Sequence, residues 1–89
     1  MFKIKIFGKK DCEACQGTKE KFRLFLENLE NKNLALMEFF DLDTVDGLLE
    51  GTMLDAVNPP TTIIENDGKE IKRWVGKVPL SKEIQEILK

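Results

Sequence analysis

With 89 residues, 42% of them hydrophobic and 34% charged, the chain has enough apolar material for the core of one globular domain over residues 1–89. Its net charge of −2 lacks the basic surplus typical of nucleic-acid binding, and no apolar run approaches the roughly 18 residues that span a bilayer. The first residues alternate lysine with apolar side chains and lack the apolar stretch of a signal peptide, so we expect a cytoplasmic protein without a membrane partner.

The chain begins with a strand and a helix. A strand is predicted over residues 2–7, because apolar residues recur there at every second position. A helix is predicted over residues 13–31, with Asp11 as its expected N-cap and Asn31-Lys32-Asn33 as its expected end. Apolar residues at helical spacing form its predicted core stripe, which comprises Cys15, Phe22, Phe25, Leu26 and Leu29.

A second strand and a second helix follow. Residues 34–42 are nearly continuous in apolar side chains, which is typical of a central parallel strand. Thr44 is the predicted N-cap of the next helix. The core face expected for this helix comprises Val45, Leu48, Leu49, Met53 and Ala56. Gly47 and Gly51 weaken it, each by about 1 kcal/mol relative to alanine.

The last third of the chain predicts a hairpin and a helix. Asn58-Pro59-Pro60 stops the preceding helix, and strands are predicted over residues 61–65 and 69–75 around a turn at Asn66-Asp67-Gly68. Ser81 is the predicted N-cap of the final helix. Its expected core face comprises Leu80, Ile84, Ile87 and Leu88.

The predicted order β-α-β-α-β-β-α indicates an α/β fold with a four-stranded mixed sheet flanked by helices on both faces. Strands joined by a helix are expected to be parallel with a right-handed crossover, and the closing hairpin is antiparallel. The two cysteines follow the carboxyl end of the first strand, where open α/β sheets place their functional sites.

Cys12 and Cys15 are the only cysteines, and the chain has no histidine. Cys12 falls at the predicted helix start outside the core stripe, whereas Cys15 lies on that stripe, so one sulfur should be exposed and the other shielded. Backbone N–H groups and the macrodipole at a helix N-terminus stabilise a thiolate, which makes Cys12 the better nucleophile. Cys15 is then placed to attack a mixed disulfide formed at Cys12.

The element order with Cys-x-x-Cys after the first strand resembles the thioredoxin and glutaredoxin superfamily, from about Ile4 to Leu88. Pro60-Thr61 opening the third strand, Gly68 in the hairpin and Val75-Gly76 before the last helix add to the resemblance. It implies the thioredoxin fold, a cis peptide bond before Pro60 and a substrate groove beside the cysteines. The implied groove residues are Pro59, Pro60, Thr61, Val75 and Gly76.

The residues around the cysteines depart from both branches of the superfamily. Thioredoxins usually place tryptophan before the first cysteine and Gly-Pro between the two, where this chain has Lys10-Asp11 and Glu13-Ala14. Ile6 stands where thioredoxins carry a buried carboxylate. The Pro-Tyr pair and the double glycine of glutaredoxins are also missing. The chain therefore resembles a small thioredoxin-like or glutaredoxin-like protein.

The resemblance implies a monomeric dithiol electron carrier without a bound cofactor, which receives electrons from a disulfide reductase and reduces disulfide-containing proteins. A second class stays open, in which the cysteines of two copies hold a metal or iron–sulfur cluster, because one pair offers only two of the four ligands that zinc requires. Trp74 is interpreted as edge-strand packing or as a substrate contact. Lys9 and Lys10 are interpreted as solvated loop charges that could also stabilise a Cys12 thiolate, an effect that Asp11 and Glu13 oppose.

Overall fold

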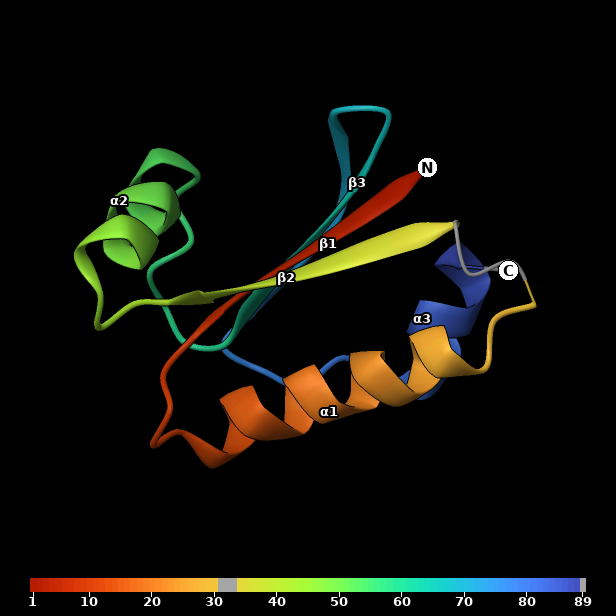
Figure 1. Ribbon diagram of the computed structural model, residues 1–89, viewed down its shortest axis with the longest axis horizontal. Coiled ribbons are helices and arrows are strands. Elements are labelled where there is room, and N and C mark those ends of the chain that lie inside the picture. The colour runs from red at the N-terminus through yellow and green to blue at the C-terminus, as the bar shows by residue number, and fades with distance from the viewer. Residues whose placement is uncertain (31–33, 89) are drawn as a thin grey trace.

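The structure is a computed structural model that describes residues 1–30 and 34–88. Its elements are β1 (Phe2–Gly8), α1 (Glu13–Glu27), β2 (Ala35–Asp41), α2 (Val45–Met53), β3 (Thr61–Asn66), β4 (Lys69–Val75) and α3 (Ser81–Ile87) (Figure 1). The order β-α-β-α-β-β-α predicted from the sequence is confirmed. None of the helices in these two ranges is long and apolar enough to cross a membrane.

The four strands form one mixed sheet in the order β2-β1-β3-β4. β1 pairs in parallel with β2 and antiparallel with β3, and β3 pairs antiparallel with β4. The prediction of a central strand over residues 34–42 was therefore wrong, since β2 lies at the edge of the sheet. Its apolar residues pack against helices and β1 instead of against a second strand.

The expectation that a helix joins parallel strands holds for β1 and β2 but is wrong for β2 and β3, because β3 runs antiparallel to β1. α2 has nine residues, which at about 1.5 Å per residue span roughly 13 Å. A seven-residue strand such as β2 spans roughly 23 Å. α2 alone therefore does not carry the chain back along the sheet, and β3 starts at the end where β2 stops, since Phe7 pairs with both Phe40 and Thr61.

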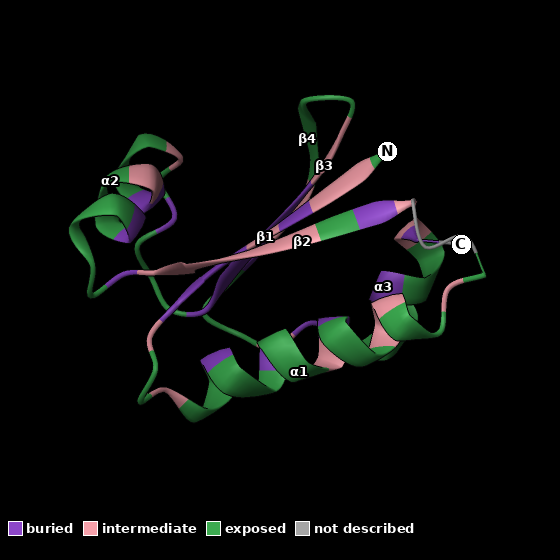
Figure 2. Cartoon of the chain, in the orientation of Figure 1, coloured by how far each residue is buried: buried purple, intermediate pink, exposed green. Residues whose placement is uncertain are grey.

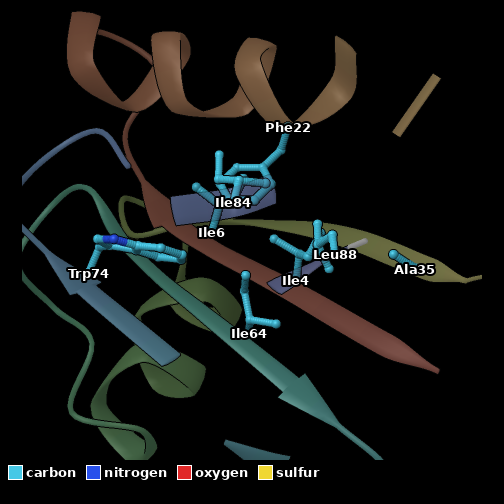
Figure 3. Packing of buried hydrophobic residues seen from close by; sticks show 8 residues of the cluster. All are labelled: Ile4, Ile6, Phe22, Ala35, Ile64, Trp74, Ile84 and Leu88. Atoms are coloured by element: carbon cyan, nitrogen blue, oxygen red, sulfur yellow. The ribbon is translucent and has the colours of Figure 1, made fainter. Parts of the chain in front are cut away.

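One face of the sheet packs against α1 and α3. Figure 3 shows Phe22 of α1 and Ile84 of α3 lying over Ile6 of β1, and Figure 2 shows that both helices keep their exposed residues on the side away from the sheet. The buried cluster on this face comprises Ile4, Ile6, Phe22, Ala35, Ile64, Trp74, Ile84 and Leu88. Trp74 is 2% exposed and its ring lies 6.4 Å from that of Phe22, which confirms the packing interpretation of this residue.

The ends of α1 and α3 differ from the prediction. α1 ends at Glu27, because Asn28 forms its C-cap and donates a side-chain hydrogen bond to the Leu24 carbonyl at 2.8 Å. The predicted stop at Asn31-Lys32-Asn33 lies outside the described residues. Leu80 instead of Ser81 is the N-cap of α3, and its N–H donates to Glu83 Oε1 at 3.4 Å. Leu80 is consequently 65% exposed and does not belong to the core.

α2 sits on the other face with its glycine side inward. The predicted N-cap is confirmed, since Thr44 Oγ1 accepts from the Gly47 N–H at 3.0 Å. The predicted core face was wrong except for Ala56, because the other four residues are exposed: Val45, Leu48, Leu49 and Met53. Gly47 and Gly51 are buried instead, and a Cβ on Gly47 would lie 1.9 Å from the carbonyl oxygen of Asp41. The two glycines thus let the helix approach the sheet closely.

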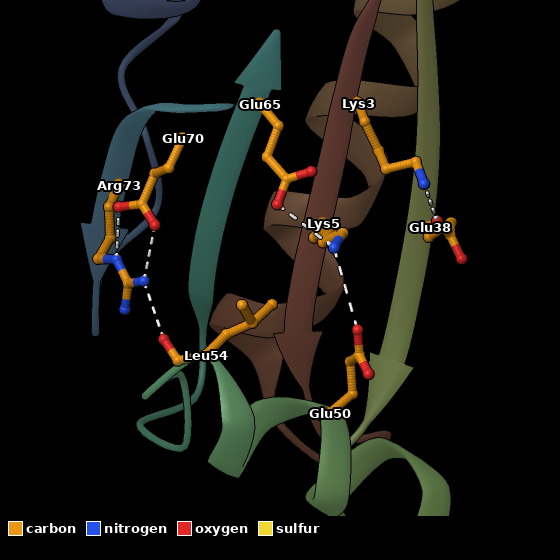
Figure 4. Close-up of polar contacts among 8 residues, drawn as sticks. All are labelled: Lys3, Lys5, Glu38, Glu50, Leu54, Glu65, Glu70 and Arg73. Carbon is orange, nitrogen blue, oxygen red and sulfur yellow. Dashed lines mark hydrogen bonds and ion pairs between the residues drawn. The ribbon is translucent and has the colours of Figure 1, made fainter. Parts of the chain in front are cut away.

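A smaller buried cluster lies under α2 and comprises Phe7, Leu42, Ala56 and Ile63. Beyond α2, ion pairs extend over the same face of the sheet (Figure 4). Lys5 Nζ lies 3.3 Å from Glu65 of β3 and 3.9 Å from Glu50 of α2, with its side chain only 13% exposed. Lys3 lies 3.5 Å from Glu38 of β2. Charged side chains therefore cover the strands that no helix reaches in the described part of the chain.

Arg73 of β4 ties the end of α2 to the sheet (Figure 4). Its guanidinium donates to the carbonyls of Leu54 at 2.9 Å and Asp55 at 2.8 Å, and to the carboxylate of Glu70. We expect Arg73→Ala to lower the free energy of unfolding by about 1–2 kcal/mol, since two carbonyls lose charged donors. Urea denaturation measures this change.

A matched control is Arg23→Ala, which removes exposed ion pairs on α1 and should cost less than about 0.5–1 kcal/mol. The hydrogen bond from Arg73 also holds the pKa of Glu70 below its ordinary value of 4.5. The stability that this pair contributes is present above pH 4.5 and is lost as the pH falls through the lowered pKa of Glu70. If Arg23→Ala lowered the free energy of unfolding as much as Arg73→Ala, the stabilising role given to the hydrogen bonds of Arg73 would be contradicted.

Candidate functional site

The two cysteines lie at the start of α1, directly after the turn that follows β1. Cys12 is the N-cap, with extended backbone angles φ −102° and ψ 113°, and Cys15 lies one turn later. Their Cα atoms are 5.2 Å apart, within the normal range for a disulfide, and the two sulfurs are bonded. Cys15 is fully buried whereas Cys12 is half-buried. Cys12 is thus the more exposed of the two cysteines, as predicted.

The sulfur of Cys12 has the role that a serine or aspartate oxygen usually has at a helix start. It accepts a hydrogen bond from the Cys15 N–H at 3.1 Å, and the Cys12 carbonyl accepts from the Gln16 N–H at 3.0 Å. The prediction of Asp11 as N-cap was therefore wrong, because Cys12 itself caps the helix. A negative charge on this sulfur is stabilised by the N–H group and by the positive end of the helix dipole.

The turn before Cys12 is held from two sides. Gln16 Nε2 donates to the carbonyls of Lys9 at 3.2 Å and Lys10 at 3.3 Å. Lys9 Nζ lies 3.5 Å from Asp43, in the turn before α2. The amine of Lys9 thus pairs with Asp43. Asp11 and Glu13, the neighbours of Cys12 in sequence, are exposed.

Gly8, the last residue of β1, lies against Cys15. A Cβ on Gly8 would be 2.8 Å from both the Cβ and the Sγ of Cys15, and 3.4 Å from the ring of Phe39. Only glycine leaves room for the sulfur at this place. The strand predicted from the sequence ended at residue 7, and the contact of Gly8 with Cys15 was not predicted. The signal was a glycine closing a strand shortly before a reactive pair, since glycine in a strand often marks a close approach of another group.

We expect Gly8→Ala to lower the free energy of unfolding of the oxidised protein by about 1–3 kcal/mol, because the added methyl group collides with Cys15. Gly17→Ala is the control, since a Cβ there meets nothing within 4 Å and alanine favours a helix interior. Thermal unfolding of the oxidised proteins compares the two. Equal stabilities of the two variants would show that the space beside Cys15 is not tight.

The predicted groove residues gather at the same end of the sheet as Gly8. Phe7 pairs with Thr61 and Thr61 pairs with Val75, so the ends of β1 and β4 flank the start of β3. The Gly76 N–H donates to the Pro60 carbonyl at 2.7 Å, and Gly76 has a φ of +70°. The peptide bond between Pro59 and Pro60 is cis, as predicted.

Exposure divides these residues into two groups. Pro60 and Thr61 are buried, whereas Pro59, Val75 and Gly76 are exposed. Thr61 Oγ1 donates to the Asn58 carbonyl at 2.6 Å, which fixes the chain before β3. The contact of these residues with a substrate stays a prediction.

Ile6 is fully buried in the core cluster on the α1 side of the sheet. It supplies packing there, and its side chain has no group that accepts a proton. The place at which thioredoxins carry a carboxylate is thus apolar in this protein.

A dithiol at the N-terminus of the helix that follows the central strand, in an α/β fold with these elements, fits a thiol–disulfide oxidoreductase. No protein-family model matches the chain, and no curated protein matches its sequence. Several of the solved structures with a similar fold are thioredoxins. Thioredoxin O2 from Arabidopsis thaliana in its oxidized state has a TM-score of 0.80 and 19% identity, over 100% of this chain and 76% of that one.

Two further thioredoxins show the same likeness. Thioredoxin 1 from Thermosipho africanus has a TM-score of 0.76 and 24% identity, over 96% of this chain and 89% of that one. A mutant thioredoxin from Halobacterium salinarum has a TM-score of 0.77 and 17% identity, over 98% and 71%. The chain therefore has the thioredoxin fold, as the resemblance implied.

Proposed function

We propose that this protein reduces disulfides in other proteins, with Cys12 as nucleophile and Cys15 as resolving thiol. The observation that carries the proposal is the unequal placement of the two sulfurs. Cys12 is partly exposed and its sulfur accepts a hydrogen bond from the Cys15 N–H at 3.1 Å, while Cys15 is buried one helical turn away. An exposed, stabilised thiolate attacks, and a shielded thiol beside it completes the exchange.

The reaction has two steps. The thiolate of Cys12 attacks one sulfur of the substrate disulfide, so that a mixed disulfide forms and the other substrate sulfur leaves as a thiolate. The thiolate of Cys15 then attacks the Cys12 sulfur, and the second substrate sulfur leaves. The substrate has gained two electrons and, once its thiolates are protonated, two protons. The protein is left with the Cys12–Cys15 disulfide that the structure contains.

The substrate chain is proposed to lie across the end of the sheet where β1, β3 and β4 meet. The exposed surface there belongs to Pro59, Val75 and Gly76. Pro59 has no backbone N–H, so its carbonyl is the only backbone group that it offers to an extended substrate. The loop at Val75-Gly76 should therefore contribute a larger share of the substrate contacts, next to the buried Pro60 and Thr61.

A disulfide reductase is proposed as the partner that returns two electrons to the oxidised pair, with the protein acting as a monomer in a reducing cytoplasm. In such a compartment a cysteine pair is more often reactive than structural.

We expect a reduction potential for the Cys12–Cys15 couple near the thioredoxin value of about −270 mV. The acidic neighbours Asp11 and Glu13 disfavour a thiolate at Cys12, and Lys9, which would favour it, lies 3.5 Å from Asp43. The helix start still stabilises the Cys12 thiolate, but these neighbours make it less stable than the thiolate of a strong oxidant, so the disulfide is relatively more stable and the couple more reducing. Equilibration with glutathione or dithiothreitol buffers, followed by alkylation, measures the potential. A value more positive than about −180 mV, the region of disulfide isomerases, would reject a reductant.

The same preparation separates this function from a metal or iron–sulfur module. Within residues 1–30 and 34–88, no three cysteine, aspartate or glutamate side chains form a group that could hold a metal ion. A cluster shared between two copies would give visible absorbance and a dimer. Two thiols that titrate after reduction and disappear on oxidation, in a colourless protein, support the oxidoreductase.

A further inference from the structure

The outward side of α2 carries an apolar stripe that no other described element covers. Val45, Leu49 and Met53 recur at intervals of four residues, with exposed fractions of 83%, 59% and 73%. Leu48 extends the stripe and is 48% exposed. Large apolar side chains that gather on one side of a helix mark an interaction surface, unlike apolar residues scattered singly.

The packing of α2 fixes this orientation. Gly47 and Gly51 lie on the opposite side of the helix from the stripe, where α2 meets the end of β2 and the residue after it. A Cβ on Gly51 would lie 2.8 Å from Leu42 Cδ2, and a Cβ on Gly47 would lie 1.9 Å from the Asp41 carbonyl oxygen. Rotating the helix to bury Val45 or Leu49 would force larger side chains into this contact. The apolar side of α2 is therefore held toward the surface.

An open hollow of about 490 Å³ adjoins the stripe, between α2 and the carboxyl end of β2. Its lining residues are Phe39, Phe40, Asp41, Thr44, Asp46, Gly47, Leu49 and Glu50. The lining contains three carboxylates and no basic residue. Leu49 belongs to the stripe and to the hollow, so the two form one continuous surface.

The charged residues of the segment around α2 all have one sign, although two of them meet lysines from β1 and the turn after it: Glu50 lies 3.9 Å from Lys5 and Asp43 lies 3.5 Å from Lys9. From Asp41 to Pro60 the sequence has five carboxylates and no lysine or arginine, although the net charge of the whole chain is only −2. A partner that presents basic groups beside apolar ones complements this surface. Two copies of the surface brought face to face would instead place carboxylates against carboxylates, which opposes self-association.

We propose that the α2 docking surface, formed by the apolar residues Val45, Leu48, Leu49 and Met53 and the carboxylates Asp46 and Glu50, binds a basic, apolar segment of a partner protein. An arginine or lysine of the segment enters the hollow beside Asp46 and Glu50, and the apolar neighbours of that basic residue cover the stripe. The surface uses no cysteine, so this binding is separate from the proposed redox function. Because Asp43 contacts Lys9 in the turn before Cys12, a bound partner lies at the same end of the sheet as the dithiol.

The probe is a synthetic amphipathic peptide of leucine and arginine, compared with a peptide in which glutamate replaces every arginine. Binding at low salt is followed by calorimetry, and the site is located by amide chemical shifts. We expect the arginine peptide to shift the resonances of α2 and of the hollow. Leu49→Ser/Met53→Ser should weaken its binding about tenfold or more, and Asp46→Asn about threefold. Leu24→Ser on α1 is the matched control, since Leu24 is 46% exposed outside the surface, and it should leave the affinity unchanged.

Each alternative outcome overturns the proposal. These outcomes are no binding, equal binding of the glutamate peptide, shifts centred outside α2 and the hollow, and an equal loss in Leu24→Ser. Dimerisation of the unmodified protein that Leu49→Ser/Met53→Ser abolishes would identify a second copy as the occupant. The measurement is repeated on Cys12→Ser/Cys15→Ser protein, which should bind as tightly, so that failure of the redox function and failure of the docking surface are distinguished.

Discussion

Cys12→Ser is expected to lower the rate of protein disulfide reduction by on the order of a thousandfold or more, because it removes the attacking sulfur. Cys15→Ser is expected to retain the first attack and to stop at the mixed disulfide, since no second thiol is present to release the substrate. Mass spectrometry of the Cys15→Ser protein mixed with a disulfide substrate should show a covalent adduct, and the Cys12→Ser protein should show none.

Limited alkylation checks the assignment without any substitution. A reagent added to the reduced protein in less than one equivalent should label Cys12, which is partly exposed, ahead of the buried Cys15. Preferential labelling of Cys15 would reverse the two roles. The folded state of both serine variants is confirmed by circular dichroism, so that a loss of activity is not a loss of structure.

Gly47→Ala is expected to have the largest effect on stability, about 3 kcal/mol or more. The added Cβ would lie 1.9 Å from the Asp41 carbonyl oxygen and 2.9 Å from Thr44 Oγ1, so α2 must move away from the sheet or lose its N-terminal cap. Chemical denaturation compares this variant with Gly17→Ala, which introduces the same methyl group in a helix with nothing within 4 Å. If both variants unfold at the same denaturant concentration, the close packing of α2 is refuted.

The sequence predicted the element order and the unequal burial of the two cysteines better than it predicted α2. Alternation in β1 and helical spacing around Phe22 reflect burial, so both patterns located their elements. The unequal exposure of Cys12 and Cys15 followed from the same spacing. For α2 the same reasoning failed, because it assumed that the apolar side of a helix faces the core, whereas Gly47 decides the orientation through a backbone contact. Such a contact depends on where β2 ends in space, which periodicity does not report.

The contact between Gly8 and Cys15 was missed for a related reason. It joins a strand to a helix across a turn, and no spacing rule within one element includes it. The position of β2 at the sheet edge also depends on strand pairing over long sequence distances. β3 pairs with the side of β1 that faces away from β2, as the pairing of Phe7 with Thr61 shows.

The ion pairs of Lys5 with Glu50 and Glu65 give the two faces of the sheet different responses to heat. Apolar packing, as under α1 and α3, gains little further strength as water warms, whereas the hydration that competes with ion pairs becomes less favourable. On warming, the ion pairs of Lys5 should therefore contribute a larger share of the stability than they do at low temperature. A sheet that adds the ion pairs of Lys5 to the apolar cluster under α2 on one face thus spreads its resistance to heating over two kinds of interaction.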